Sequence, residues 1–417
     1  MPLIRPFAGL RPAPGQSSAV LAPPYDVLNA AEARRRAADK PWSFLRISKP
    51  EIDLPPDTKP YADIVYQTGA RNLRAMIDND VLQRDPTPCY YLYRLQAGEH
   101  VQTGLVALAS VHAYEEQWIR RHEFTRPDKE EDRVRQIDAL NAQTGPVLLA
   151  HKGSDVMARW VNELSTTEAV LDVTAEDGVR HTLWIIDDPE AIHSITEVFA
   201  PERGGSVATL YIADGHHRSA AAARVAAQRR QRMAVPDPNA DYEWFLSVIF
   251  PAQQMRILDY NRIVRDLYGL SIREFLTQVS TRFDVTPVPY AFHPTRPREF
   301  GLYLDGHWYR MRFPEELLPE DPVERLDVSL LQTYLIDPVL GIVDPRRDER
   351  IEFVGGIRGL SELERRVDSG EMAVAFALHP TTMEQLISVA DAHQVMPPKS
   401  TWFEPKLADG LISHQFD

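Results

Sequence analysis

The residues best suited to chemistry form a short polar sequence, Asp214-Gly-His-His-Arg218. It follows an apolar run over 207–212 and precedes an alanine-rich segment that ends near Arg230, a pattern that predicts a strand, a loop and a helix. The first turn of a helix has unpaired backbone N–H groups and partial positive charge, which favour a phosphate. Gly215 lets the backbone approach a ligand closely, and Arg218 is able to hold two phosphate oxygens. We therefore expect Gly215, His216, His217 and Arg218 to bind a phosphate.

Each of these residues also has an ordinary structural interpretation. In that interpretation Asp214 or Ser219 caps the helix, Arg218 is a solvated surface residue, and the histidines make local hydrogen bonds. The clustering of an acid, two imidazoles and a guanidinium at one strand-to-helix turn favours the binding interpretation.

A second candidate lies in Arg120-Arg-His-Glu-Phe-Thr125. Glu123 precedes Pro127 and a charged helix expected over 128–141, so it sits outside regular helix beside His122. Its ordinary interpretation is a surface ion pair with Arg120 or Arg126.

Two further stretches offer polar groups near prolines. Tyr25 and Asp26 end the stiff sequence Pro-Pro-Tyr-Asp, where a rigid turn before a helix and a ligand contact are equally plausible. Lys399, Ser400 and Thr401 place a cation and two hydroxyls within one turn, a combination able to hold a carboxylate or phosphate. A tail held down by Trp402 and Phe403 is the alternative for the last group.

Residues 214–218 resemble the signature of the ParB/sulfiredoxin-like fold. Their sequence, Asp-Gly-His-His-Arg, is similar to the corresponding motif of the free serine kinases. Together with Pro23–Asp26, Arg121–Thr125 and Met396–Thr401, it identifies the chain as a member of the bacterial domain-of-unknown-function 1015 family. The resemblance spans residues 23–401.

This resemblance implies a small-molecule kinase that uses ATP or ADP to phosphorylate the hydroxyl of a free amino acid, L-serine first among the candidates. Glu123 matches the catalytic base of the free serine kinases, with His122 beside it, and Lys399, Ser400 and Thr401 resemble their substrate anchor. Tyr25 and Asp26 join the expected substrate contacts. Asp214 is a candidate ligand for Mg²⁺ brought in with the nucleotide. The extra sequence between Glu123 and Asp214 departs from the kinases and leaves the acceptor open.

Three other functions compete with the kinase. The ParB resemblance implies a nucleotide-binding regulator that phosphorylates no metabolite. Sulfiredoxin-like chemistry is excluded, because Gly215 and His216, not a cysteine, precede the His217-Arg218 pair. A metal enzyme built on His216 and His217 is disfavoured, because adjacent histidines seldom point at one ion.

The composition of the chain limits which partners the protein can bind and in which cellular compartment we expect it. The chain has 417 residues, with 46 Lys and Arg against 60 Asp and Glu, giving a net charge of −14. This charge, without a long basic run, argues against a nucleic-acid partner. Cys89 is the only cysteine, so a disulfide within the chain is impossible. The sequence lacks a signal-peptide pattern and any long apolar run, which predicts a cytoplasmic protein without a membrane partner. The oligomeric state is left open.

Alternating strand and helix patterns predict a mixed α/β fold, here expected to be a ParB/sulfiredoxin-like nucleotide-binding core over 1–250. A second α+β domain over 251–417 is expected to close over it and to contribute Lys399–Thr401. Among its elements we expect a strand over Met255–Val264 and an amphipathic helix over Leu326–Leu340. A hairpin is expected in the first domain, with strands over 90–95 and 101–111.

Overall fold

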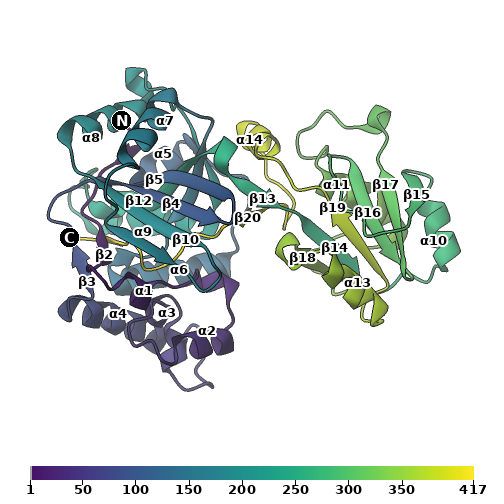
Figure 1. Ribbon diagram of the computed structural model, residues 1–417, viewed down its shortest axis with the longest axis horizontal. Coiled ribbons are helices and arrows are strands. Elements are labelled where there is room, and N and C mark those ends of the chain that lie inside the picture. Colours follow the sequence, from purple (N-terminus) through teal and green to yellow (C-terminus); the bar gives the residue numbers. More distant parts are fainter. Residues whose placement is uncertain (1) are drawn as a thin grey trace. The chain divides into compact units, whose positions relative to one another are not determined.

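The computed structural model describes residues 2–417, which form two compact units. The first unit runs through Met255 and includes Pro405–Asp417, and the second is Arg256–Glu404. Figure 1 shows the elements of both. Residues 405–417 therefore belong with the first unit, although the sequence led us to expect all of 251–417 in the second. Their backbone pairs with strands of the first unit, which explains the difference.

A mixed nine-stranded sheet forms the centre of the first unit, in the order β6-β11-β8-β12-β5-β4-β10-β9, with β1 paired to β5. β11 runs parallel to β6 and β12 runs parallel to β8, and the other pairs are antiparallel. The expected hairpin is confirmed as β4–β5. The strands are β1 (Ile4–Arg5), β4 (Tyr90–Ala97), β5 (His100–Ser110), β6 (Ile119–Arg120), β8 (Val147–His151), β9 (Leu171–Thr174), β10 (Arg180–Ile186), β11 (Leu210–Asp214) and β12 (Trp244–Pro251).

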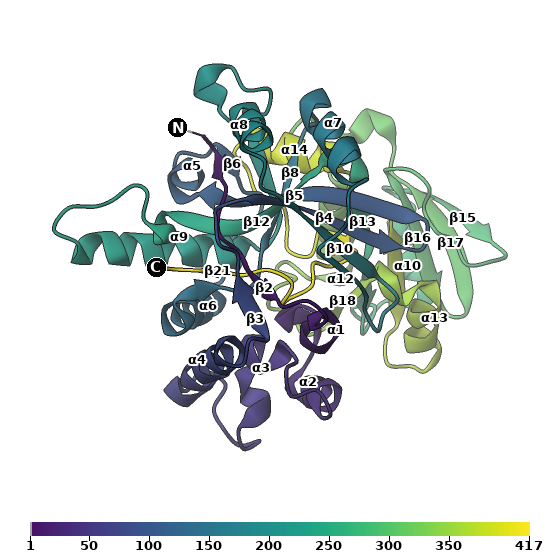
Figure 2. The same ribbon diagram turned by 60° about the vertical axis from the view of Figure 1, so that its left-hand side comes forward.

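Helices and two short strand pairs surround this sheet. The helices are α1 (Ser17–Val20), α2 (Ala30–Ala37), α3 (Leu45–Ser48), α4 (Asp63–Asp78), α5 (Val111–Glu115), α6 (Pro127–Leu140), α7 (Asp155–Leu164), α8 (Pro189–Val198) and α9 (His216–Arg232). The pairs are β2 (Leu10–Pro12) with β3 (Leu82–Arg84), and β7 (Ala142–Gln143) with β21 (His414–Gln415). α9 packs beside α6, and β21 lies near them (Figure 2). Ala222 and Ala226 of α9 belong to the apolar core of the central sheet, which holds this helix against the sheet.

The second unit has a six-stranded sheet in the order β15-β17-β16-β19-β14-β18 and a separate β13–β20 pair. Its strands are β13 (Arg256–Leu258), β14 (Tyr260–Val264), β15 (Asp284–Val288), β16 (Glu299–Leu304), β17 (His307–Arg312), β18 (Ile351–Gly355), β19 (Val374–Leu378) and β20 (Trp402–Glu404). Its helices are α10 (Ile272–Val279), α11 (Asp327–Leu331), α12 (Asp337–Leu340), α13 (Leu360–Asp368) and α14 (Met383–Asp391). The apolar core of this unit includes Ile263, Leu363 and Ala375, which come from β14, α13 and β19.

Two elements of the second unit differ from the sequence expectation. The strand expected over Met255–Val264 is broken at Asp259, whose backbone carbonyl accepts a hydrogen bond from Gly356 N–H. The helix expected over Leu326–Leu340 contains a π-helical turn over Gln332–Ile336. Pro338 follows this turn and has no N–H to continue regular helical bonding, which favours the irregularity.

The architecture as a whole confirms the mixed α/β class. Its assignment as ParB/sulfiredoxin-like stays a prediction. Across residues 2–417, the helices lack the combination of length and apolar character that is needed to cross a bilayer.

Candidate functional site

The junction between β11 and α9 has the strand, loop and helix that the sequence predicts. Gly215 connects them with φ 96° and ψ 27°, a left-handed conformation that L side chains rarely adopt. A Cβ at this position would also lie 3.3 Å from Val147 Cα on β8. Glycine is thus required here both by conformation and by space.

The side chains at the junction do not cap helix α9, contrary to its ordinary structural interpretation. Asp214 Oδ1 accepts from the N–H of Gly215 at 2.8 Å, and the Ser219 hydroxyl donates to the His216 carbonyl at 3.1 Å. No side chain among the described residues caps α9. The first turn therefore has the backbone donors and partial charge that suit an anion.

Asp214 is held by a lysine that the sequence analysis did not single out. Lys406 Nζ lies 3.2 Å from Asp214 Oδ2. Burial opposes ionisation of this carboxyl, but Lys406 and Arg218 outweigh burial and lower its pKa. Asp214 is consequently ionised at neutral pH. Nothing in the local sequence relates Lys406 to Asp214, because the two are brought together only by the return of residues 405–417 to the first unit.

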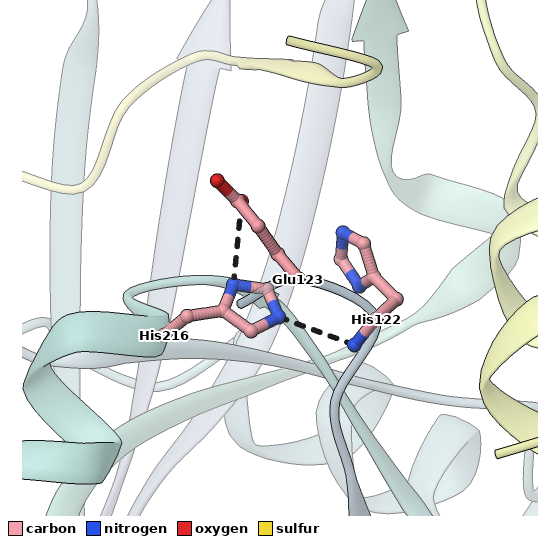
Figure 3. A group of neighbouring side chains, drawn as sticks. All are labelled: His122, Glu123 and His216. Atoms are coloured by element: carbon pink, nitrogen blue, oxygen red, sulfur yellow. Dashed lines mark hydrogen bonds and ion pairs between the residues drawn. The ribbon is translucent and has the colours of Figure 1, made fainter. Parts of the chain in front are cut away.

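Glu123 and His216 meet beside this junction (Figure 3). Strand β6 ends at Arg120 and runs parallel to β11, so the segment after β6 passes the start of α9. Glu123 Oε2 lies 3.8 Å from His216 Nδ1, and the Glu123 side chain is 46% exposed. The carboxylate therefore lies beside His216 and is accessible to a ligand.

His122 lies on the other side of His216. Its backbone N–H donates to His216 Nε2 at 3.4 Å, and the two rings are perpendicular with centroids 4.5 Å apart. Burial lowers the pKa of His122 to about 4, and burial together with nearby His122 lowers that of His216 well below its ordinary value. Both imidazoles are neutral near pH 7.

His217 contacts the same segment at a different point. Its Nε2 accepts a hydrogen bond from the backbone N–H of Arg126 at 3.0 Å. The two adjacent histidines thus bond to backbone groups four residues apart in the 122–126 segment, and they do not share a partner.

Arg218 lies with the two residues expected to contact substrate near the N-terminus. A guanidinium nitrogen is 3.8 Å from Asp26 Oδ2, and the group lies 5.9 Å from the centre of the Tyr25 ring. Arg218 also donates to the Pro146 carbonyl, and its side chain is only 13% exposed. Burial opposes its charge, but Asp26 and Asp214 raise its pKa, so the guanidinium is a buried, permanently charged group.

A small cavity of about 40 Å³ adjoins Arg218. This volume is enough for one or a few water molecules. Asp409 lines it and is only 3% exposed, and burial raises the pKa of its carboxyl to about 7 despite nearby Arg218. The sequence analysis did not identify Asp409. The lining includes Tyr25, Arg133, Gln143, Gly145, Arg218 and Asp409.

Lys399, Ser400 and Thr401 belong to the second unit, in the loop before β20. Lys399 Nζ lies 5.5 Å from the Tyr260 ring, and the Lys399 carbonyl accepts from Arg262 at 3.1 Å. The buried Ser400 hydroxyl donates to the Pro397 carbonyl at 2.7 Å. The hydroxyl proton of Ser400 is therefore engaged within the loop.

These features define a mixed α/β protein whose central sheet ends in a strand–glycine–helix junction surrounded by buried charges. Residues 4–329 match the model of the family described as protein of unknown function, DUF1015. The chain belongs to this family, as the sequence motifs predict.

Solved structures provide three distant similarities. A mutant free serine kinase in complex with AMP is 13% identical, with a TM-score of 0.35, and the alignment covers 72% of this chain and 87% of that one. A conserved hypothetical protein from Pyrococcus furiosus is 14% identical, with a TM-score of 0.34 and coverage of 73% and 93%. SbnI from Staphylococcus aureus, truncated at its C-terminus, is 10% identical, with a TM-score of 0.35 and coverage of 72% and 84%. No curated protein matches the chain in sequence.

Proposed function

We propose that this protein is a kinase that transfers a phosphoryl group from ATP or ADP to the hydroxyl of a free amino acid, with L-serine the first candidate and O-phosphoserine its product. The observation that carries the proposal is the position of the Glu123 carboxylate. It is 46% exposed and lies against His216 at the beginning of α9, where Gly215 and the first helical turn suit a phosphate.

Phosphoryl transfer requires positioned phosphates, neutralised charge and a base. In the proposed site the first-turn backbone, His216, His217 and Arg218 hold the nucleotide phosphates. Glu123 lies at the edge of this group and serves as the base. His122 supports it by donating its backbone N–H to His216.

The chemical step needs little beyond these groups. The substrate oxygen forms a bond to the terminal phosphorus of the nucleotide as the bond from that phosphorus to the bridging oxygen breaks. Glu123 takes the hydroxyl proton, and the shortened nucleotide leaves with the electron pair of the broken bond.

Asp214 fits the proposed role of a magnesium ligand. Its two oxygens accept from Gly215 N–H and Lys406 Nζ, and a carboxylate has about four lone-pair positions, so sites remain for a cation. Mg²⁺ prefers such oxygen ligands and, when bound with the nucleotide, supplies neutralising charge at the phosphates.

The remaining predicted residues complete the proposal on the substrate side. Lys399 offers an ammonium for the carboxylate of the amino acid, and Ser400 and Thr401 are proposed to shape that anchor. Tyr25 and Asp26, which lie beside Arg218, are proposed to contact the ligand at the other end. The long segment between Glu123 and Asp214 departs from the free serine kinases and leaves the acceptor open. Other hydroxy amino acids are therefore tested beside serine.

The decisive assay incubates purified protein with ATP or ADP, Mg²⁺ and a panel of hydroxy amino acids, and detects phosphorylated product by mass spectrometry. Product that depends on one amino acid supports the kinase. Nucleotide binding or hydrolysis that no amino acid affects would instead support a nucleotide-dependent regulator.

Replacing Glu123 with glutamine tests the base directly. Glu123→Gln keeps the shape of the side chain and removes its basicity, so we expect turnover to fall by about a hundredfold to ten-thousandfold. Nucleotide affinity, measured by calorimetry, and the melting temperature should change little, because the side chain is half exposed.

The matched control is Glu116→Gln, an exposed glutamate in the turn that precedes β6. It should leave turnover unchanged. If Glu123→Gln retains turnover within a few-fold of the parent at similar substrate affinity, Glu123 is not the base.

A further inference from the structure

We infer that His122, Glu123 and His216 form a binding site for a divalent transition cation of the Zn²⁺ class. One candidate ligand atom from each residue lies within 4.8 Å of the other two. The residues follow two parallel neighbouring strands: His122 and Glu123 come after the end of β6, and His216 begins α9 after the end of β11. Figure 3 shows the three side chains gathered around one space.

The state of His122 provides the second and independent observation. This side chain is only 2% exposed, and neither ring nitrogen completes a hydrogen bond among residues 2–417, although the Ile212 backbone lies beside the ring. Buried polar groups are nearly always hydrogen-bonded, so an imidazole without a partner needs a physical explanation. A cation bound by one of its nitrogens supplies that partner.

The spacing of the ligands is close to what coordination requires. Zn²⁺ bonds of about 2.0–2.2 Å at tetrahedral angles place neighbouring ligand atoms about 3.3 Å apart. His216 Nδ1 and Glu123 Oε2 are 3.8 Å apart. The three ligand atoms all lie within 4.8 Å of one another, so the half-exposed Glu123 side chain and the two imidazoles must draw together when the cation binds.

Coordination also sets the protonation of His216. Its Nδ1 must present a lone pair to the cation, so the ring proton moves to Nε2. That nitrogen now accepts from the His122 backbone N–H at 3.4 Å, a contact longer than an ordinary hydrogen bond. The protonated Nε2 then faces the His122 N–H as a second donor, so this contact must lengthen on binding, and a metal bond takes the place of one weak hydrogen bond.

The donor set distinguishes this cation from magnesium. Two imidazole nitrogens and one carboxylate oxygen suit Zn²⁺, Co²⁺ or a related ion, whereas Mg²⁺ prefers oxygen ligands. Three protein ligands leave a fourth position open, as at catalytic zinc sites. His217 is not part of the set, because its Nε2 is engaged with Arg126.

The site stands independently of the kinase proposal, but one consequence depends on it. A cation bound to a Glu123 oxygen withdraws electron density from the carboxylate and lowers the basicity that the proposed base needs. Zn²⁺ is thus expected to inhibit phosphoryl transfer at concentrations that fill the site, and this consequence alone rests on the proposed function.

The test uses the full untagged chain, stripped of metal with a chelator and titrated with Co²⁺. Four-coordinate Co²⁺ gains visible absorption, and elemental analysis after dialysis against Zn²⁺ gives the stoichiometry. We expect one ion per chain. Glu123→Gln and His216→Gln should each weaken binding at least about tenfold, the lower end of what losing even a supporting group costs at metal sites.

His193→Ala, which removes an exposed histidine of α8, is the control and should leave the affinity unchanged. Circular dichroism checks that each variant is folded. If the variant of the buried His216 does not fold, the comparison between the parent and Glu123→Gln decides the test. No bound ion in the parent, or the same affinity in the parent and in folded Glu123→Gln, would overturn the site. A parent that binds Co²⁺ but phosphorylates no hydroxy amino acid would retain the site and remove the kinase proposal.

Discussion

Arg218 shows how buried charges organise the candidate site. The sequence leads us to expect phosphate binding by this arginine, with a solvated surface residue as the alternative. The side chain is only 13% exposed and lies near Asp26 and Asp409, which rules out the solvated alternative. A buried charge is stabilised only when partners offset its desolvation. A ligand phosphate that approaches Arg218 therefore joins a group of charges that already partly balance one another.

Asp409 makes the stability of the first unit depend on pH. Burial raises the pKa of this carboxyl to about 7, whereas an aspartate in an unfolded chain titrates near about 3.9. Because the folded pKa is higher, the contribution of Asp409 to stability is fully present below about pH 4 and is lost as pH rises through about 7. Asp409→Asn abolishes this titration.

We expect Asp409→Asn to be more stable relative to the parent at pH 8 than at pH 5. The slope attributable to this one group is at most about 1.4 kcal/mol per pH unit. Urea denaturation of both proteins at the two pH values measures it. Asp57→Asn, at an exposed aspartate, is the control. Parallel curves for Asp409→Asn and the parent would show that Asp409 titrates normally.

The connection from β11 to α9 rests on one glycine conformation. Gly215 has φ 96°, and a Cβ there would lie 3.3 Å from Val147 Cα on the neighbouring strand. Backbone atoms of a central strand cannot move aside as a flexible side chain does. The orientation of the first helical turn is therefore set by a position that accepts no side chain.

Gly215→Ala should destabilise the protein by more than the cost of the left-handed conformation, which is about 1–2 kcal/mol. Gly178→Ala is a matched control, because Gly178 has φ +84° but no heavy atom within 4 Å of its would-be Cβ. The difference between the two unfolding free energies isolates the contact with Val147. If the two variants lose equal stability, the sheet accommodates the added methyl group.

The sequence predicts this junction because its determinants are local. An apolar run, a glycine and an alanine-rich segment lie within 207–230, and β11 and α9 follow them, although β11 begins only at Leu210. Lys406 and Asp409 could not be predicted, because they reach the junction through strand pairing between segments far apart in the chain. The π-helical turn at Gln332–Ile336 was missed for a related reason, since the apolar spacing of 326–340 is the same with or without it.

The division into two units explains why the last residues matter to the site. The chain leaves the first unit at Met255 and returns at Pro405. On its return Asp409 pairs with Ala22, Ser413 pairs with Leu10, and β21 pairs with β7. This segment brings Lys406 and Asp409 to the junction. The charges around Asp214 and Arg218 therefore depend on how the segment packs.

Phe416 is a buried anchor of this returning segment. It is 4% exposed and packs with Val134 and Ile137 of α6 and with Ala221 and Val225 of α9. Its backbone N–H also donates to the Asn141 carbonyl at 3.0 Å. Phe416→Ala should destabilise the first unit by about 3–5 kcal/mol, the usual cost of removing a buried phenylalanine side chain. Val235→Ala, at a side chain that is 78% exposed, should stay within about 0.5 kcal/mol of the parent.

Hydrogen exchange locates the effect of Phe416→Ala within the chain. If the two units unfold separately, protection should fall in α6, α9 and β7, while β14, β16 and β19 of the second unit keep theirs. Loss of protection in both sets would mean that the units unfold as one. Unchanged protection in α6 and α9 would show instead that α9 does not need the side chain of Phe416. The backbone pairing of residues 405–417 would then be enough to keep Lys406 beside Asp214.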